Sequence, residues 1–203
     1  THMIGGGFQL VRLNLRDAKN RDEFIKLVEA AAKEKKEGEW LLGGKWSVDS
    51  WSDPSPPRAA WLDPVTGKTP TFLTRMDGHE AVANSVALKL AGIDANGPAD
   101  PVGGEIERDP KTKEPTGILK DAAMDLVDKF IPEPSAKDRY EALLRAMRHA
   151  NSLGVTSVHD MSGLADLDAF RQAGKDRSLT VRITSYLSTE DWSKYSDPIV
   201  KDH

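Results

Sequence analysis

The sequence predicts an α/β protein, and two stretches of the chain predict it. From Ser135 to Leu187, helical and strand patterns alternate with short loops, as they do in parallel β/α units. Between Gly104 and Leu119, two short apolar runs flank the polar turn Asp109–Glu114, which is typical of a β-hairpin. The chain is therefore expected to combine parallel β/α units with an antiparallel segment.

Composition bounds the class of protein. With 203 residues the chain can bury one good core or two small ones, and its 38% hydrophobic and 30% charged residues are ordinary for a globular protein. A formal net charge of −4 and a pI near 5.8 argue against a nucleic-acid or anionic-membrane surface. No apolar run reaches the length of a membrane span and no secretory signal opens the chain, so we expect a cytoplasmic protein. The absence of cysteine excludes disulfides, thiolate metal sites and a cysteine nucleophile.

The first part of the chain is predicted to hold two strands around a helix. Phe8–Leu15 alternates as a short strand. Asn20 begins a capping box with a glutamate three residues on, and the apolar face of the helix continues to about Lys36. Trp40–Leu42 then lead a second strand into Gly43–Gly44, a pair that indicates close backbone approach or a bulge.

Ser47–Lys68 is predicted to be a long irregular loop, because it is rich in proline. A loop of this length inside a compact domain is either functional or mobile. Tryptophans in and beside it could line a substrate pocket or anchor the loop to the core. We favour the pocket for Trp46 and anchoring for Trp61.

Thr71–Ile93 is predicted to run from a strand into a helix that ends at Gly92. The turn between them holds Arg75, Asp77 and His79, and scaffolds commonly present chemistry at such turns. Equally, Arg75 and Asp77 can form a structural ion pair, with His79 as a capping residue. The spacing leaves both interpretations open.

The later part of the chain is predicted to hold three helices and two strands. Pro132 stops the first helix, Ser135 caps the second and Gly154 ends it. In chain order, the predicted elements are helix 119–131, helix 135–153, strand 155–160, helix 164–173 and strand 179–187.

Four stretches, in order, resemble the metal-dependent amidohydrolases, specifically the amidohydrolase family 3 branch: GEWLLGGKW, DGHEAVANSVALKLAGI, GGEIERDPKTKEPTGILKDAAMDLV and NSLGVTSVHDM. The resemblance covers nearly the whole chain but only part of such an enzyme. It implies a fragment of a TIM-type (β/α) barrel carrying a large α+β insertion. Residues 1–7 would end the first barrel strand and form a Gly-rich turn, 8–132 would be the insertion, and 133–203 early barrel units.

The resemblance also implies a divalent metal, which we expect to be zinc. The first barrel strand of the family ends in a His-x-His pair that binds metal, followed by a Gly-rich turn. His2, just before Gly5–Gly7, matches the second histidine of that pair. We therefore assign His2 as a metal-ligand position, although a tag remnant also places histidine before methionine. The metal would activate a water for attack on an amide-type carbonyl.

Most family ligands and the catalytic aspartate lie on later barrel strands, for which this sequence has no matching segment. We therefore expect a partial hydrolase of non-peptide C–N bonds, inactive alone, with no complete catalytic set. His159 ends a predicted strand, where a β/α barrel faces its active site, although it could instead be a buried, hydrogen-bonded histidine beside a helix-capping Asp160. The expected substrate-binding residues are Trp46, Arg75, Asp77, His79 and His159.

The sequence also bears on two other functions. The chain could be a non-catalytic ligand-binding module with the fold of the insertion. A complete hydrolase using Asp77, His79 and His159 is disfavoured. A serine triad needs a nucleophile beside a histidine, and the candidates Ser85, Ser157 and Ser162 all lie outside a Gly-x-Ser-x-Gly elbow. The expected partners are a small amide-type substrate, the remainder of the parent barrel and a second copy of the chain, because an open barrel fragment exposes strand edges and apolar faces.

Overall fold

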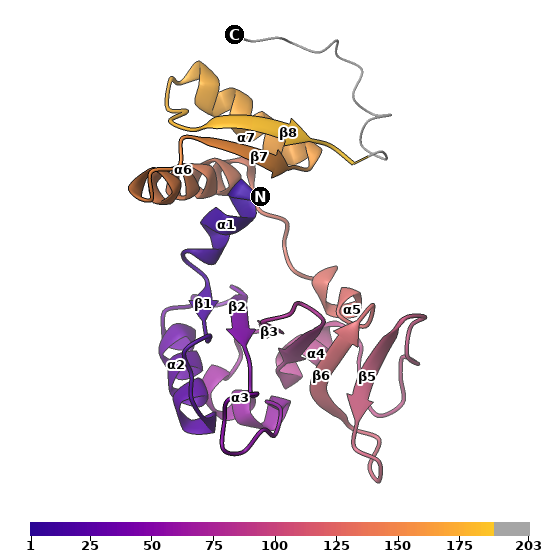
Figure 1. Ribbon diagram of the computed structural model, residues 1–203. Coiled ribbons are helices and arrows are strands. Elements are labelled where there is room, and N and C mark those ends of the chain that lie inside the picture. Colours follow the sequence, from indigo (N-terminus) through magenta and orange to yellow (C-terminus); the bar gives the residue numbers. More distant parts are fainter. Residues whose placement is uncertain (189–203) are drawn as a thin grey trace. The chain divides into compact units, whose positions relative to one another are not determined.

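The computed structural model describes residues 1–188 (Figure 1). The chain divides into two compact units. One consists of Thr1–Val11 together with the described residues from Glu133 onward, and the other of Arg12–Pro132. Each unit has its own sheet and hydrophobic core. Residues 189–203 of the predicted barrel segment 133–203 lie outside the described residues. Within residues 1–188, no helix is both long and apolar enough to cross a membrane.

The unit Arg12–Pro132 is built on a six-stranded sheet with the order β1-β2-β3-β4-β6-β5. The strands are β1 (Leu13–Asn14), β2 (Leu41–Trp46), β3 (Thr71–Arg75), β4 (Glu80–Ala83), β5 (Gly104–Arg108) and β6 (Pro115–Asp121). The first three are parallel neighbours, and the pairs from β3 to β5 across the sheet are antiparallel. Its helices are α2 (Arg21–Lys33), α3 (Ala59–Thr66), α4 (Ser85–Leu90) and α5 (Asp125–Asp128). The mixed sheet combines two β/α crossovers with the predicted hairpin, β5–β6.

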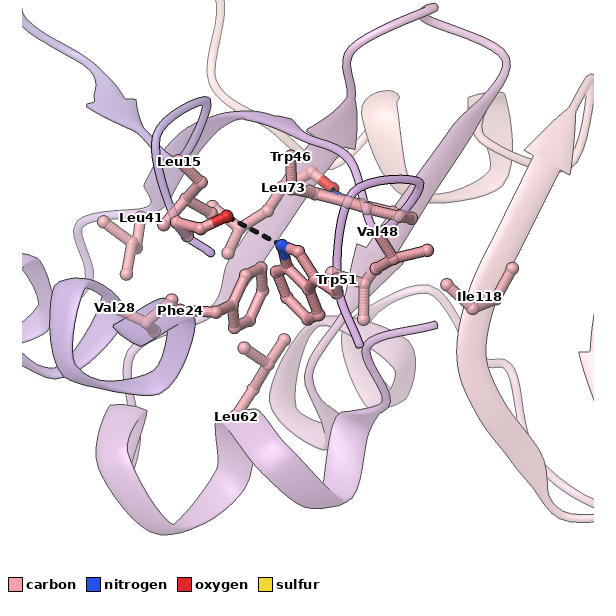
Figure 2. Close-up of a cluster of buried hydrophobic side chains, with 12 residues drawn as sticks. Leu15, Phe24, Val28, Leu41, Trp46, Val48, Trp51, Leu62, Leu73 and Ile118 are labelled. Atoms are coloured by element: carbon pink, nitrogen blue, oxygen red, sulfur yellow. Dashed lines mark hydrogen bonds between the residues drawn. The ribbon is translucent and has the colours of Figure 1, made fainter. Parts of the chain in front are cut away.

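Both faces of this sheet are covered by apolar side chains. Leu73 pairs with Val82, and both belong to the core that includes Phe24 of α2 and Leu62 of α3 (Figure 2). Phe72 and its neighbours on the opposite face form a second core with residues of α4 and α5. Alternate positions along a strand point to opposite faces, so a strand buried on both sides needs apolar residues at nearly every position.

The glycine pair of β2 allows its backbone to lie very close to both neighbouring strands. A Cβ on Gly43 would lie 2.2 Å from the carbonyl oxygen of Leu13, and one on Gly44 would lie 2.2 Å from that of Thr74. Both have positive φ, +136° and +121°. The pairing register with β3 also shifts between Gly44 and Trp46. Close approach and a bulge, the two alternatives that the sequence indicated, both occur.

Asn84 ties the parallel half of the sheet to α4. The residue is completely buried, and its Oδ1 accepts from the backbone N–H of Thr71 and of Ala87, each at 3.0 Å. Its Nδ2 donates to Thr66 Oγ1 and to the Thr69 carbonyl, each at 2.9 Å. The side chain therefore caps α4 and at the same time fixes where β3 begins.

Several secondary-structure predictions for the chain up to Pro132 need correction. Val82 and Ala83 lie in β4 rather than in a helix, because their strand pairs with β3 and β6. Ala59–Thr66, predicted to be loop, forms α3, whose apolar residues pack onto the core. The helix predicted over 119–131 is reduced to α5, because β6 extends to Asp121. At the N-terminus, the predicted Gly-rich turn and the start of the predicted strand at Phe8 are both replaced by a helix, Met3–Gln9.

The other unit consists of three helices and two parallel strands. They are α1 (Met3–Gln9), α6 (Ala136–Ser152), β7 (Ser157–Met161), α7 (Leu164–Lys175) and β8 (Arg182–Tyr186). The predicted capping box at Ser135 is present and opens α6. The predicted parallel pairing is also confirmed, with His159 opposite Thr184 and Met161 opposite Tyr186. α1 packs closely on α6, since a Cβ on Gly7 would lie 1.9 Å from the Ala142 carbonyl oxygen.

The two faces of the β7–β8 sheet differ. Val158 and Ile183 pack into a core formed with α1, α6 and α7. The alternate residues are exposed, and they are Ser157, His159, Met161, Arg182, Thr184 and Tyr186. We call these six residues the open face.

We predict that Asn84→Ala will destabilise the unit Arg12–Pro132 by about 2–4 kcal/mol, because it leaves two buried N–H donors without their acceptor. The free energy of unfolding from urea denaturation measures the effect. Asn96→Ala, at an exposed position, is the control and should stay within about 0.5 kcal/mol of the unsubstituted chain. Equal stability of the two variants would contradict the role of Asn84.

Candidate functional site

Arg75 ends β3 within a group of carboxylates. Its guanidinium donates to Asp49 Oδ1 and to Asp77 Oδ2, both at 3.0 Å, and lies 3.9 Å from Glu80. The structural ion pair that the sequence left open is therefore formed. The ion pairs use two of the five N–H donors of the guanidinium, and a quarter of the side chain remains exposed.

Asp77 and His79 form the turn between β3 and β4. Asp77 Oδ1 accepts from the backbone N–H of His79 at 3.0 Å, which fixes the turn. The ring of His79 is exposed, and its Nδ1 lies 2.8 Å from Oδ1 of Asp121. This hydrogen bond, together with the negative charge of Asp121, raises the pKa of His79 above its ordinary value. His79 is thus an exposed side chain whose protonated form is favoured by its contact with Asp121.

Asp121 was not singled out from the sequence. It ends β6, and its backbone N–H donates to the His79 carbonyl at 2.9 Å, so the two residues are joined through both backbone and side chains. They lie 42 positions apart in the chain, and only the pairing of β4 with β6 brings them together. No local sequence pattern predicts the pairing of β4 with β6.

Trp46 lies in the core shown in Figure 2. None of its surface is exposed, and its Nε1 donates to the Leu73 carbonyl at 2.8 Å. Trp51 is also buried, and it anchors its loop by donating to the Ala18 carbonyl at 2.7 Å. Trp61 packs against the same core. The predicted pocket role of Trp46 gains no support from its position, which is that of a core residue.

In the other unit, Thr1 extends the β7–β8 sheet along the free edge of β7. The Thr1 nitrogen donates to the His159 carbonyl at 2.8 Å, and Met161 N–H donates to the Thr1 carbonyl at 2.9 Å. These two bonds flank Asp160, the pattern of a parallel pair. Thr1, β7 and β8 therefore form three parallel segments, and His2 follows directly at the end of the first.

The ring of His2 has a defined tautomer. Its Nδ1 lies 2.9 Å from the carbonyl oxygen of Met161. A carbonyl oxygen can only accept, so Nδ1 carries the proton and the neutral ring keeps the lone pair of Nε2 free. Metal-binding histidines commonly donate their other ring N–H to such a carbonyl. His2 thus fits the predicted role of one metal ligand, whereas residues 1–188 contain no group of three or more His, Asp or Glu side chains that could hold a metal.

His159 projects from the open face of β7. Its Nδ1 lies 2.9 Å from the hydroxyl of Tyr186, and the two rings stack with centroids 5.6 Å apart. The residue is exposed rather than buried, and Asp160 caps α1 rather than α7 through a 2.7 Å bond from Met3 N–H. Tyr186 was missed from the sequence, because its closeness to His159 depends on the register between β7 and β8.

A hollow of about 730 Å³ lies beside His2 within the same unit. Gly5, Gly6 and Phe8 of α1 line part of it. Arg139 lines another part and is paired with Asp166 at 3.0 Å and with Glu133 at 2.9 Å. The hollow is therefore lined on one side by Gly5, Gly6 and Phe8 and on another by Arg139, whose charge is balanced by Asp166 and Glu133.

We predict that Asp121→Asn will lower the pKa of His79 toward its ordinary value, because the hydrogen bond and charge of Asp121 are the largest causes of its rise. A raised folded-state pKa contributes stability that is complete below the unfolded-state pKa, near 6.5, and is lost as the pH rises through the folded-state value. NMR titration of the His79 ring measures the shift. Asp77→Asn is the control and should lower the pKa less, and an unchanged pKa in Asp121→Asn would contradict the assignment.

Comparisons with known proteins place these residues in a family. The model of the amidohydrolase family, in its family 3 branch, matches residues 1–200. Protein LONG AFTER FAR-RED 3 of Arabidopsis thaliana is 41% identical over an alignment of 207 positions, which covers 97% of this chain and 35% of that protein. N-substituted formamide deformylase of Arthrobacter pascens is 35% identical over 68% of this chain and 26% of its own length.

A solved structure agrees with the sequence relatives. An uncharacterized metal-dependent hydrolase from Pyrococcus horikoshii OT3 superposes with a TM-score of 0.68 and 26% identity, over 95% of this chain and 36% of its own. The chain therefore spans about a third of the length of the relatives it matches over nearly all its residues. On its sequence and its fold, the chain belongs to the amidohydrolase family 3 branch of the metal-dependent hydrolases.

Proposed function

We propose that the chain is part of a metal-dependent hydrolase of non-peptide, amide-type C–N bonds, and that it is inactive by itself. The observation that carries the proposal is the position of His2, whose Nδ1 is committed to the Met161 carbonyl and whose Nε2 remains free for a metal. Family membership supplies the hydrolase class. The similarity to a formamide deformylase supports the choice of an amide-type bond.

The unit of Thr1–Val11 and the described residues from Glu133 is proposed to be a piece of barrel wall. Thr1, β7 and β8 are parallel, their helix-side residues are covered, and the alternate residues form the open face. This is the arrangement of a β/α barrel strand, with one face toward the helices and the other toward the barrel interior. The unit Arg12–Pro132 is correspondingly proposed to be the insertion that contributes to covering the substrate.

His2 lies at the C-terminal ends of the three parallel segments, where β/α barrels place their active sites. Thr1 is paired with Asp160 of β7, so the next residue, His2, lies opposite Met161. Met161 is in turn paired with Tyr186 of β8. His159 is two positions deeper on the open face and contacts Tyr186. We propose that His159, supported by Tyr186, contacts the substrate close to the metal ligand.

The proposed metal, zinc, would lower the pKa of a bound water and polarise the carbonyl of the substrate. His2 would supply one ligand of the several that such a site requires. In the insertion, the proposed substrate contacts are His79, which is exposed, and Asp77 and Arg75, which are engaged in ion pairing. One ligand alone explains why the isolated chain is proposed to be inactive.

We predict no turnover of N-substituted formamides by this chain with added Zn²⁺, and metal-dependent turnover by a longer protein that contains it. In that longer protein, His2→Ala should lower the rate at least about 100-fold, because the metal loses a ligand. His149→Ala, at an exposed position of α6, is the control and should leave the rate unchanged. Release of formate reports the rate. Turnover by the isolated chain comparable to that of the longer protein would contradict the proposal, and binding without turnover in both would favour the ligand-binding module.

We also predict that the isolated chain associates with a second copy, because Met161 and Tyr186 expose 64% and 53% of their surface on the open face. Light scattering should give a mass above that of one chain at high concentration. Tyr186→Lys should lower the fraction of the associated form, while Leu90→Lys, on α4 of the other unit, serves as the control. A clean monomer of the unsubstituted chain at high concentration would contradict this prediction.

A further inference from the structure

Asp160 is a buried carboxylate with both oxygens in use. Only 1% of the residue is exposed. Its Oδ1 accepts from the backbone N–H of Met3 at 2.7 Å, and its Oδ2 accepts from the hydroxyl of Ser162 at 2.6 Å. A carboxylate is costly to bury and is retained only with such compensation. Through the bond to Met3, Asp160 therefore contacts the segment that carries His2.

The bond to Met3 replaces a helix cap. Met3 is the first residue of α1, and the residue before it, His2, makes no side-chain capping bond. The first N–H groups of a helix have no partner within the helix and attract negative charge. Asp160 supplies the acceptor from β7, which lies 157 positions away in the sequence.

The residues on either side of His2 in the sequence are consequently both held by hydrogen bonds. Thr1 is held by its two backbone bonds to His159 and Met161, and Met3 is held by Asp160. Between these anchors the His2 ring can reach the Met161 carbonyl, which sets its tautomer. A shift of the segment along β7 would break the Met3 bond and the ring bond together.

We propose that Asp160 is the positioning residue for His2, orienting its ring so that Nε2 faces a metal. This inference rests on the proposed function, in which His2 is a metal ligand. Asp160 acts through Met3 and does not touch the metal. Its role is to remove alternative positions of the His2 backbone before a metal binds, so that the metal does not have to order the segment itself.

The test combines three variants and a control. Asp160→Ala removes both acceptors. Asp160→Asn retains an oxygen for Met3 N–H, and its amide can donate to Ser162, so it should rescue. Asp160→Ser keeps a polar group but is too short to hold Met3, and it replaces the alanine variant if that protein does not fold. Asp168→Ala removes an exposed carboxylate of α7 and is the control.

Two readouts follow the position of His2 without any metal. ¹⁵N NMR of the ring should show a single Nδ1–H tautomer in the unsubstituted chain, and a mixture in Asp160→Ala or Asp160→Ser. Amide hydrogen exchange at Met3 and Met161 should become at least about tenfold faster in those two variants. In Asp160→Asn and Asp168→Ala, both properties should remain as in the unsubstituted chain.

A third readout addresses the metal. In a longer protein that contains this chain, Zn²⁺ affinity by competition with a chelator should fall about 10–100-fold in Asp160→Ala or Asp160→Ser, and should be unchanged in the control. Unchanged affinity, with an unchanged His2 tautomer, would overturn the positioning role while leaving the proposed function intact. Absence of Zn²⁺ binding by the unsubstituted longer protein would instead overturn the proposed function and the metal-directed part of this inference.

Discussion

A buried backbone N–H needs an acceptor, and in each unit one polar side chain meets this requirement at a junction that the rest of the unit depends on. In the mixed sheet Asn84 accepts from Thr71 and Ala87, so the start of β3 and the start of α4 are fixed by the same oxygen. In the other unit Asp160 accepts from Met3. Both side chains are buried, and each joins separate elements of its unit through hydrogen bonds to the backbone.

The exposed residues of the two units differ in what they offer a ligand. At the end of β3, Arg75 lies within 4 Å of Asp49, Asp77 and Glu80, so carboxylates outnumber the cation. Such a cluster favours neutral or cationic groups over anionic ones. On the open face, by contrast, His159 and Tyr186 present two stacked aromatic rings joined by a hydrogen bond, and Arg182 adds a cation to the same face.

Local signals in the sequence predicted the parts of the fold that depend on neighbouring residues. The caps at Asn20 and Ser135 and the hairpin of β5 and β6 are of this kind, since each is decided within a few positions. The spacing of Val82 and Ala83 suits a helix and predicts one. Their strand is decided by Leu73 and Ile118, with which Val82 pairs on either side, and such pairing leaves no mark on the local pattern.

The same distinction separates the site residues that were predicted from those that were missed. His2 and His159 belong to stretches that resemble a known family, whereas Asp121 and Tyr186 are recognised only through their partners. Asp121 is 42 positions from His79, and Tyr186 is 27 positions from His159, so each pair depends on a strand register. A correct register for β4–β6 and β7–β8 would have identified both residues, because it brings Asp121 beside His79 and places Tyr186 diagonally opposite His159 on the same face.

If His2 is a metal ligand, as proposed, the bonds at Thr1 and Met3 explain how this chain can hold that ligand in position while the rest of the metal site is supplied by other parts of the protein. When ligand side chains are mobile before the metal binds, binding must restrict them, and this loss of conformational entropy lowers the affinity for the metal. Here the ordering of one ligand is completed by backbone pairing at Thr1 and by Asp160 at Met3, both within one unit. The tautomer is likewise set by the Met161 carbonyl before any metal arrives. A single prepared histidine binds a metal weakly, so the benefit of this arrangement is realised only when further ligands converge on the same point. In the proposed enzyme, the early barrel strands thus reduce the cost of assembling the metal centre, and the remaining strands would determine its geometry and reactivity.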